Sequence, residues 1–181
     1  VLKRIEAIKQ YSDAEILVVE YQCYSLDFVV QRDRIKALVG DNFVTMYENK
    51  MDILLYIKYF QPDIIHIDEM SERLDRAMVT ALYSADRKYR IVETCHDTSF
   101  RAVEKVFNPD GYAFCSPYHL TTFKELPSPR SVIQYPIENL KPTIAQKKSA
   151  KKALGLDPAK KHVVNIGLWT SGKNQGEGLQ I

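Results

Sequence analysis

The chain has 181 residues, of which 45% are hydrophobic and 27% are charged, and its formal net charge is +2. This composition predicts a folded domain with an apolar core. It argues against a nucleic-acid partner, because a large excess of basic charge is missing. Three widely spaced cysteines, Cys23, Cys95 and Cys115, match no metal-ligand spacing and favour a reducing compartment, so we expect a cytoplasmic protein without a metal site. The apolar runs fall far short of the roughly 20 residues that span a bilayer.

Strand-like and helix-like patterns alternate along the chain. The predicted helices cover residues 1–11, 31–39, 49–61, 72–85, 100–107, a segment from 116, and 146–154, and the predicted strands cover 15–21, 43–47, 63–69, 89–92, 112–115, 131–135 and 161–166. Short connections between alternating strands and helices are the signature of βαβ units, so we predict an α/β fold with a parallel sheet and helices on both faces.

The chain is predicted to contain one domain and the start of another. Residues 1–136 form the first domain, 137–145 are a linker that follows Pro136, and 146–181 open the second domain. Val1 enters a helical pattern at once and no Met precedes it, so we expect the sequence to begin inside a longer protein.

The stretch from Arg90 to Ser99 contains several reactive side chains in a row, because a predicted buried strand is followed directly by Thr-Cys-His-Asp. The carboxyl ends of parallel strands form the crevice where ligands bind, so His96 and Asp97 are candidate catalytic residues. The alternative is that this pair only accompanies a helix N-cap at Thr98 or Ser99. Cys95 is expected to be a buried structural cysteine, since adjacent residues of a strand face opposite ways.

The strand over residues 63–69 brings two more acids to the same edge. Its nearly continuous apolar run predicts a strand covered on both faces, with Asp68 and Glu69 at its carboxyl end. Adjacent carboxylates have the wrong geometry for two acids that flank one bond. His66 lies inside the run and is expected to be a hydrogen-bonded core histidine rather than a ligand.

Two segments near the end of the chain suggest anion binding. Glycines and polar residues over 167–173 follow a predicted strand, where backbone N–H groups and an ammonium can hold a phosphate; the alternative is a loop of ordinary turn formers. Residues 141–161 hold seven lysines against one aspartate. Lys147, Lys148, Lys151 and Lys152 repeat at helical spacing, which predicts either a solvated face or peripheral contact with an anionic membrane.

The order of these motifs resembles the retaining GT-B glycosyltransferases of family 4. The similar stretches are Gln61–Glu69, Glu93–Asp97, Asp110–Ser116, Val132–Ile137, Leu154–Leu156 and His162–Asn174. The resemblance implies two Rossmann-like domains that face a cleft, the first for a saccharide or lipid-linked acceptor and the second for a nucleotide-sugar donor. The donor, UDP- or GDP-linked, is a substrate, and no cofactor is expected.

The resemblance also implies roles for single residues. His96 matches a histidine close to the transferred sugar, and Asp97 would orient it or a nearby loop. Asp68, Glu69 and Ser116 are candidates on the acceptor side. The donor diphosphate would be held by Gly167, Thr170, Ser171 and Lys173, although Leu168 stands where the family often has arginine.

Two parts of the family pattern are not in this sequence. The glycine-rich loop after the first strand would precede Val1, and a glutamate pair that holds the donor would follow Ile181, so we expect the chain by itself to be inactive. Two other functions remain open: a nucleotide-sugar 2-epimerase of the same fold, and a non-enzymatic flavodoxin-like binding module.

Overall fold

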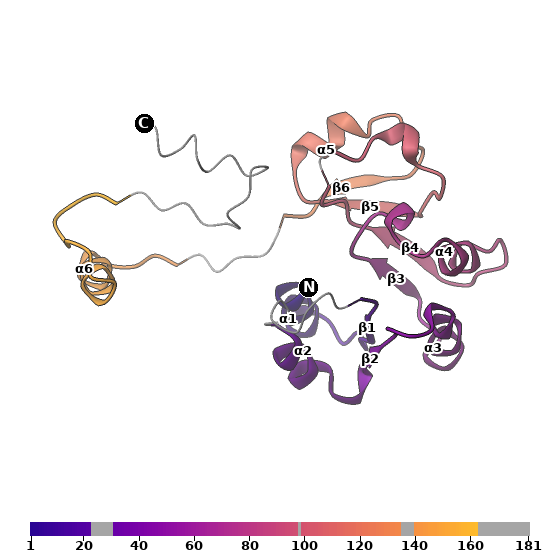
Figure 1. Cartoon of the computed structure of the whole chain (residues 1–181), viewed down its shortest axis with the longest axis horizontal. Helices are drawn as coiled ribbons and strands as arrows, with labels where there is room; N and C mark the ends of the chain where they lie inside the picture. Colours follow the sequence, from indigo (N-terminus) through magenta and orange to yellow (C-terminus); the bar gives the residue numbers. More distant parts are fainter. Residues whose placement is uncertain (23–30, 98, 135–139, 163–181) are drawn as a thin grey trace. The chain divides into compact units, whose positions relative to one another are not determined.

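The computed structural model describes residues 1–22, 31–97, 99–134 and 140–162. The chain divides into two compact units, Val1–Ile137 and Glu138–Ile181. Figure 1 labels the elements of both.

The first unit is an α/β structure with parallel sheets. Its α-helices are α1 (Leu2–Tyr11), α2 (Arg32–Val39), α3 (Ile53–Phe60), α4 (Arg76–Leu82) and α5 (Pro117–Thr122). Its strands are β1 (Val18–Glu20), β2 (Phe43–Thr45), β3 (Ile64–Ile67), β4 (Arg90–Glu93), β5 (Gly111–Phe114) and β6 (Arg130–Val132). Single 3-10 turns lie at Gly40–Asn42, Lys50–Asp52, Ser71–Arg73 and Ala102–Glu104.

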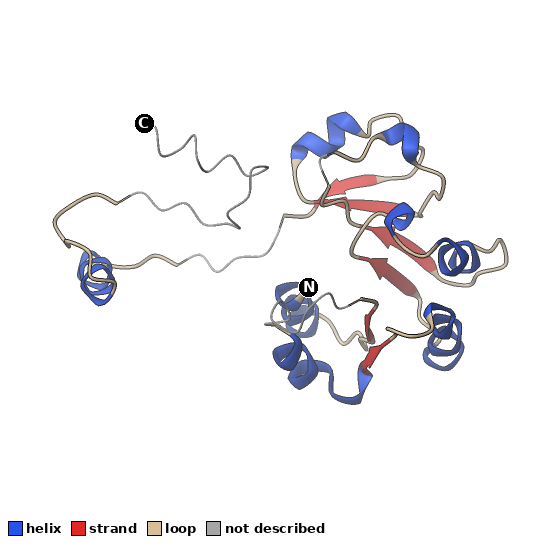
Figure 2. Cartoon of the chain, viewed as in Figure 1, coloured by secondary structure: helices blue, strands red, loops and turns tan. Residues whose placement is uncertain are grey.

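All described strand pairs are parallel, and they form two sheets (Figure 2). One sheet has the order β1-β2 and the other the order β3-β4-β5-β6. In the larger sheet, His66 lies opposite Val92 and Ile67 opposite Glu93, which fixes the faces of the two strands that matter for the site.

Local signals in the sequence explain several element ends. Helix α2 ends at Gly40, whose positive φ of 60° is costly for residues with a side-chain Cβ. Helix α3 ends at Gln61, before Pro62, and α4 begins at Asp75, whose carboxylate accepts a hydrogen bond from the Met78 N–H.

Alternate residues of the larger sheet pack into apolar cores on one face. Ile67 and Ile91 join Met78, Val79 and Leu82 of α4 in one core. A second core, around Phe114, contains Met70, Cys95, Phe100, Tyr112 and Phe123.

Two expectations about this unit are wrong. Strand β3 is not covered on both faces: Ile64 is 61% exposed and His66 is also exposed, because the apolar core packs against the opposite face, where Ile67 is buried. The helix expected over 100–107 shrinks to the turn Ala102–Glu104, since the N–H groups of Val106 and Phe107 donate to the Glu72 carboxylate instead of to helical carbonyls.

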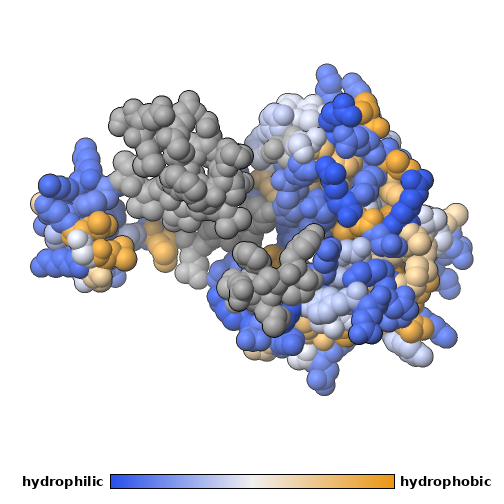
Figure 3. Space-filling view, viewed as in Figure 1, coloured by the Kyte–Doolittle hydropathy of each residue, from blue (hydrophilic) through white to orange (hydrophobic). Residues whose placement is uncertain are grey.

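The second unit contains helix α6 (Ile144–Ala153) in its described part. Thr143 and Gln146 form a reciprocal capping box at its start, which explains why a lysine-rich segment forms a helix here. The visible surface of α6 is mostly hydrophilic (Figure 3). The strand expected over 161–166 lies almost entirely outside the described residues.

Candidate functional site

Three chemically active side chains meet at the carboxyl edge of the larger sheet. Asp68 follows β3, His96 follows β4 and Cys115 follows β5, so three neighbouring parallel strands each bring one group to the same edge. We call the set Arg4, His66, Asp68, Thr94, His96 and Cys115 the edge cluster.

His96 is the centre of the edge cluster. Its Nε2 lies 3.2 Å from Asp68 Oδ1, and its Nδ1 lies 3.4 Å from Cys115 Sγ. The side chains of His96 and Asp68 are 27% and 30% exposed, so both are open to small molecules. The arrangement joins an acid, an imidazole and a thiol in one chain of contacts.

Helix α1 contributes a cation to this edge. Arg4 Nη1 lies 2.8 Å from Asp68 Oδ1 and 3.4 Å from His66 Nε2. Burial by itself would raise the pKa of Asp68, but hydrogen bonds from His96 and Arg4 hold that pKa well below its ordinary value. Asp68 is therefore a carboxylate at neutral pH.

His66 lies on the same face and is neutral. Its Nε2 is 2.7 Å from Thr94 Oγ1, and Arg4 on the other side can only donate, so Nε2 accepts. Partial removal of the ring from water, beside Thr94 and Arg4, and the Arg4 charge lower the pKa of His66 to about 4. The residue is thus hydrogen-bonded as expected, but it lies on an exposed edge strand rather than in the core.

Asp97 makes its contacts away from His96. Its carboxylate accepts hydrogen bonds from the N–H and Oγ of Ser99 and pairs with Arg73 at 2.8 Å. The Ser99 hydrogen bonds and Arg73 lower the pKa of Asp97. Asp97 holds the loop after β4, and Asp68 is the carboxylate on His96.

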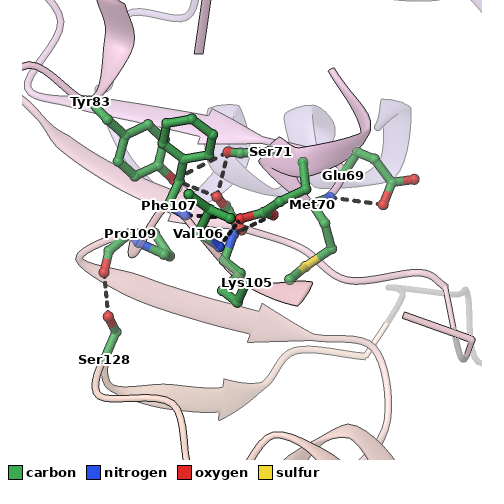
Figure 4. Close-up of polar contacts among 11 residues, drawn as sticks. Glu69, Met70, Ser71, Tyr83, Lys105, Val106, Phe107, Pro109 and Ser128 are labelled. Atoms are coloured by element: carbon green, nitrogen blue, oxygen red, sulfur yellow. Dashed lines mark hydrogen bonds and ion pairs between the residues drawn. The ribbon is translucent and has the colours of Figure 1, made fainter. Parts of the chain in front are cut away.

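Glu69 and Ser116 make local contacts at the same sheet edge. Glu69 Oε1 accepts a hydrogen bond from the Met70 N–H at 2.8 Å, and Figure 4 shows its side chain turned toward that group. Ser116 is the N-cap residue of α5, and its Oγ lies 3.4 Å from His119 Nδ1. The predicted donor residues Gly167, Thr170, Ser171 and Lys173 lie outside the described part of the chain.

A second polar group, which we call the enclosed cluster, contains Ser71, Glu72, Tyr83, Glu93 and Lys105. Figure 4 labels Ser71, Tyr83 and Lys105. Lys105 Nζ lies 2.8 Å from Glu72 and 2.5 Å from Glu93, and the three side chains are 12% exposed or less. The hydroxyls of Ser71 and Tyr83 also donate to Glu93. Hydrogen bonds from Lys105 and two backbone N–H groups outweigh burial and lower the pKa of Glu72.

The two polar clusters lie on opposite faces of the sheet. Glu93 alternates with Thr94 along the chain and pairs in register with Ile67, whose side chain is in the core. Glu93 lies two residues after the buried Ile91 and therefore shares its face of the strand, so its interior position could have been predicted from the sequence. Its ion-pair partner, Lys105, could not have been predicted, because the sequence favours a helix over residues 100–107 and gives no sign of a contact with Glu93.

The described cysteines differ in their surroundings. Cys95 is fully buried, as expected, and burial raises the pKa of its thiol to about 11. Cys115 is partly exposed and contacts His96. Sequence reasoning missed Cys115, although its place at the end of the next strand was a usable signal.

Two other features of the described residues bear on ligand binding. They contain no group of three or more His, Cys, Asp or Glu side chains able to hold a metal ion. An open hollow of about 260 Å³ shares no residue with the edge cluster; it is lined by Leu17, Asp41, Val44, Tyr56, Tyr59 and Phe60.

Comparison with protein-family models, with curated proteins and with solved structures gives no match to this chain. None of the helices in the described ranges combines the length and the apolar composition needed to cross a membrane.

Proposed function

We propose that this chain is the acceptor-side part of a glycosyltransferase that moves a sugar from a nucleotide-sugar donor to a saccharide or lipid-linked acceptor. The observation that carries the proposal is His96, fixed by Asp68 at the carboxyl edge of a parallel sheet. This is the position at which the resemblance to family 4 expects a histidine near the transferred sugar. The order of similar motifs, from Gln61–Glu69 to His162–Asn174, is the second support.

The edge cluster suits the recognition of sugar hydroxyls. Asp68 contacts Nε2 of His96 and Cys115 contacts its Nδ1, and the partly exposed Asp68 carboxylate can also accept hydrogen bonds from hydroxyl groups. Arg4 balances the Asp68 charge, which leaves a polar edge without a large excess of either charge. Such a site binds a neutral, hydroxyl-rich molecule better than a strongly charged one.

The donor half of the proposed site rests on the sequence. Lys173, with Gly167, Thr170 and Ser171, would neutralise and hold the donor diphosphate and so stabilise the leaving group.

The test is sugar transfer by the full-length gene product that contains this sequence. Labelled UDP- and GDP-sugars are offered with saccharide and lipid-linked acceptors to the unsubstituted protein, to His96→Ala and to the surface control Arg101→Ala. We expect His96→Ala to lower kcat by about 100-fold, a typical effect for a group that acts on the reacting atoms, with little change in nucleotide Kd. Arg101→Ala should match the unsubstituted protein.

Two results would contradict the proposal. One is the absence of transfer from every donor in the panel. The other is a His96→Ala variant that loses nucleotide affinity and keeps its kcat, because that would place His96 on the donor side.

Contact with an anionic membrane belongs to the same proposal. Helix α6 carries four lysines, Lys147, Lys148, Lys151 and Lys152. An apolar residue stands at each end of the helix: Ile144 is its first residue, Leu154 follows its last, and each is 74% exposed. Clustered lysines gain about 1 kcal/mol each near anionic lipid, so cosedimentation with phosphatidylserine vesicles should fall when the four are changed to glutamate. Equal cosedimentation of both proteins would exclude this contact.

A further inference from the structure

The Cys115 thiol lies against Nδ1 of His96, and Asp68 contacts the other nitrogen of the same ring. Three strands supply the three groups, and the contacts are 3.4 Å from Sγ to Nδ1 and 3.2 Å from Nε2 to Oδ1. We propose that Cys115 is a reactive thiol that takes small electrophiles, peroxides above all, with His96 as its general base and Asp68 as the residue that positions the imidazole. This inference goes beyond sugar transfer and does not depend on it.

The tautomer of His96 follows from its partners. Asp68 is ionised and can only accept, so the His96 Nε2 carries the hydrogen that points at it. A neutral ring with a proton on Nε2 has its lone pair on Nδ1, and Nδ1 faces the Cys115 sulfur. Nucleophile, base and orienting carboxylate therefore stand in the order that activates a thiol.

The chemistry balances without any group from outside the site except the electrophile. As the Cys115 sulfur attacks one oxygen of hydrogen peroxide, Nδ1 of His96 takes the thiol proton. The O–O bond breaks, and the departing hydroxide receives that proton from the imidazolium and leaves as water. The sulfur is oxidised to a sulfenic acid and the peroxide is reduced. With iodoacetamide, a C–S bond forms, iodide leaves and the proton passes to solvent through His96.

Cys95 provides a matched control in the same chain. It lies on the core side of the sheet, is fully buried, and has its Sγ 3.3 Å from the Asp97 carbonyl oxygen instead of beside a base. Burial raises its pKa to about 11, so it should be inert near neutral pH. Cys23 lies outside the described residues and gives a separate peptide.

Several charged and titratable groups lie near His96 and can influence how the reaction rate of Cys115 depends on pH. Arg4 and His66 approach from α1 and β3, and His119 approaches from α5. Asp97 and Arg73 form an ion pair in the loop regions beside it. His66 and His119 both have lowered pKa values, the first cause being burial, so they stay neutral at pH 7.

The first measurement is the rate of iodoacetamide labelling at Cys115 and Cys95, read by peptide mass spectrometry at pH 7 and pH 9.5. The proteins are the unsubstituted chain, His96→Gln, Asp68→Asn and Cys115→Ser, with circular dichroism to confirm that each is folded. At pH 7 we expect Cys115 to react at least 10-fold faster than Cys95. Loss of the base in His96→Gln should slow Cys115 about 10-fold, and Asp68→Asn should slow it less.

The comparison between the two pH values separates catalysis by His96 from a structural role. At pH 9.5 hydroxide ionises an accessible thiol without help, so the His96→Gln rate should approach that of the unsubstituted chain. Equal rates for these two proteins at pH 7, or an equal slowing of His96→Gln at both pH values, would overturn the role of His96.

The second measurement tests the class of electrophile. The protein is treated with hydrogen peroxide at low concentration and then with dimedone, which labels sulfenic acids. In the unsubstituted chain Cys115 should be labelled and Cys95 should not. In the Cys115→Ser protein no residue of the edge cluster should be labelled. A chain whose Cys115 stays unlabelled after peroxide would overturn the assignment of peroxides. Both measurements use no sugar or nucleotide, so their failure is independent of the proposed transferase.

Discussion

The edge cluster and the enclosed cluster both include residues of, or next to, strands β3 and β4, and they lie on opposite faces of the sheet. His66 and Thr94 lie on one face, and Glu93 lies on the other, among residues of the core. Glu93 is fully buried, whereas the His96 side chain is 27% exposed. The contrast shows how a one-residue alternation separates polar groups that are buried in the fold from polar groups that are exposed to solvent.

The reason for the difference is the covering of the two faces. Helix α4 and the segment around Lys105 close one face, so every polar group there needs a partner inside the protein. On the other face Ile64 is 61% exposed and His66 is exposed. The side chains of Asp68 and His96, at the end of that face, are also accessible to solvent. Burial therefore fixes Lys105 and Glu93 as a pair, while the edge cluster keeps contact with water.

The largest expected effect is the loss of the enclosed cation. Lys105→Met leaves the Glu93 carboxylate buried without its counter-charge, and removal of one partner of a buried pair costs about 3–5 kcal/mol of unfolding free energy. Urea unfolding followed by circular dichroism measures the change. The exposed pair between Arg101 and Glu104 is the control, where Arg101→Met should cost about 0–1 kcal/mol.

A double variant sharpens this prediction. Glu93→Gln in the Lys105→Met protein removes the stranded charge and should restore part of the lost stability. If Lys105→Met costs no more than Arg101→Met, the enclosed cluster does not support the fold in the way its geometry indicates.

The next effect is a difference in pH response between the clusters. The folded pKa of His66 is about 4 and its unfolded pKa is 6.5, so between these values the unfolded chain binds more protons and stability falls as pH falls. Because the residue is exposed, solvent screening limits the loss to about 1 kcal/mol. The lowered pKa of Glu72 instead gives stability that is present above about pH 4.5 and is lost only below it.

Urea midpoints measured from pH 7.5 to pH 3.5 test both parts. His66→Asn should flatten the curve between pH 6.5 and 4, apart from a smaller share of the same sign from His119, whose pKa is also lowered by burial. Glu72→Gln should flatten it only below pH 4.5. An unchanged slope in His66→Asn would show that the His66 ring is more hydrated than its contacts imply.

The smallest effect distinguishes the two aspartates near His96. Asp97→Ala removes an exposed ion pair with Arg73 and should cost at most about 1 kcal/mol. It should leave the His96 imidazole resonances in place, whereas Asp68→Asn should move them, because Asp68 contacts the ring. NMR of the imidazole protons makes the comparison, and a larger shift from Asp97→Ala would reverse the two assignments.

The sequence by itself determined the kind and order of most elements. Apolar periodicity, Gly40, Pro62 and the cap at Asp75 are local signals, and local signals suffice to begin and end helices and strands. The burial of Cys95 and the arrival of Asp68 and His96 at one sheet edge also followed from alternation and from parallel order. The element ends and the alternation of buried and exposed positions depend on residues close together in the chain, and the shared edge follows from the general rule that strands in βαβ units run parallel.

Only the tertiary structure decided which partners meet across that edge. Asp68 and His96 are 28 residues apart, and Cys115 lies 19 residues beyond His96, so their contacts depend on strand order and register. The same holds for Glu72, whose carboxylate takes the N–H groups of Val106 and Phe107 and prevents the helix that local periodicity favoured. A long-range hydrogen bond to a partly buried carboxylate outweighs helix propensity, because the propensity of a single residue contributes only a few tenths of a kcal/mol to about 1 kcal/mol.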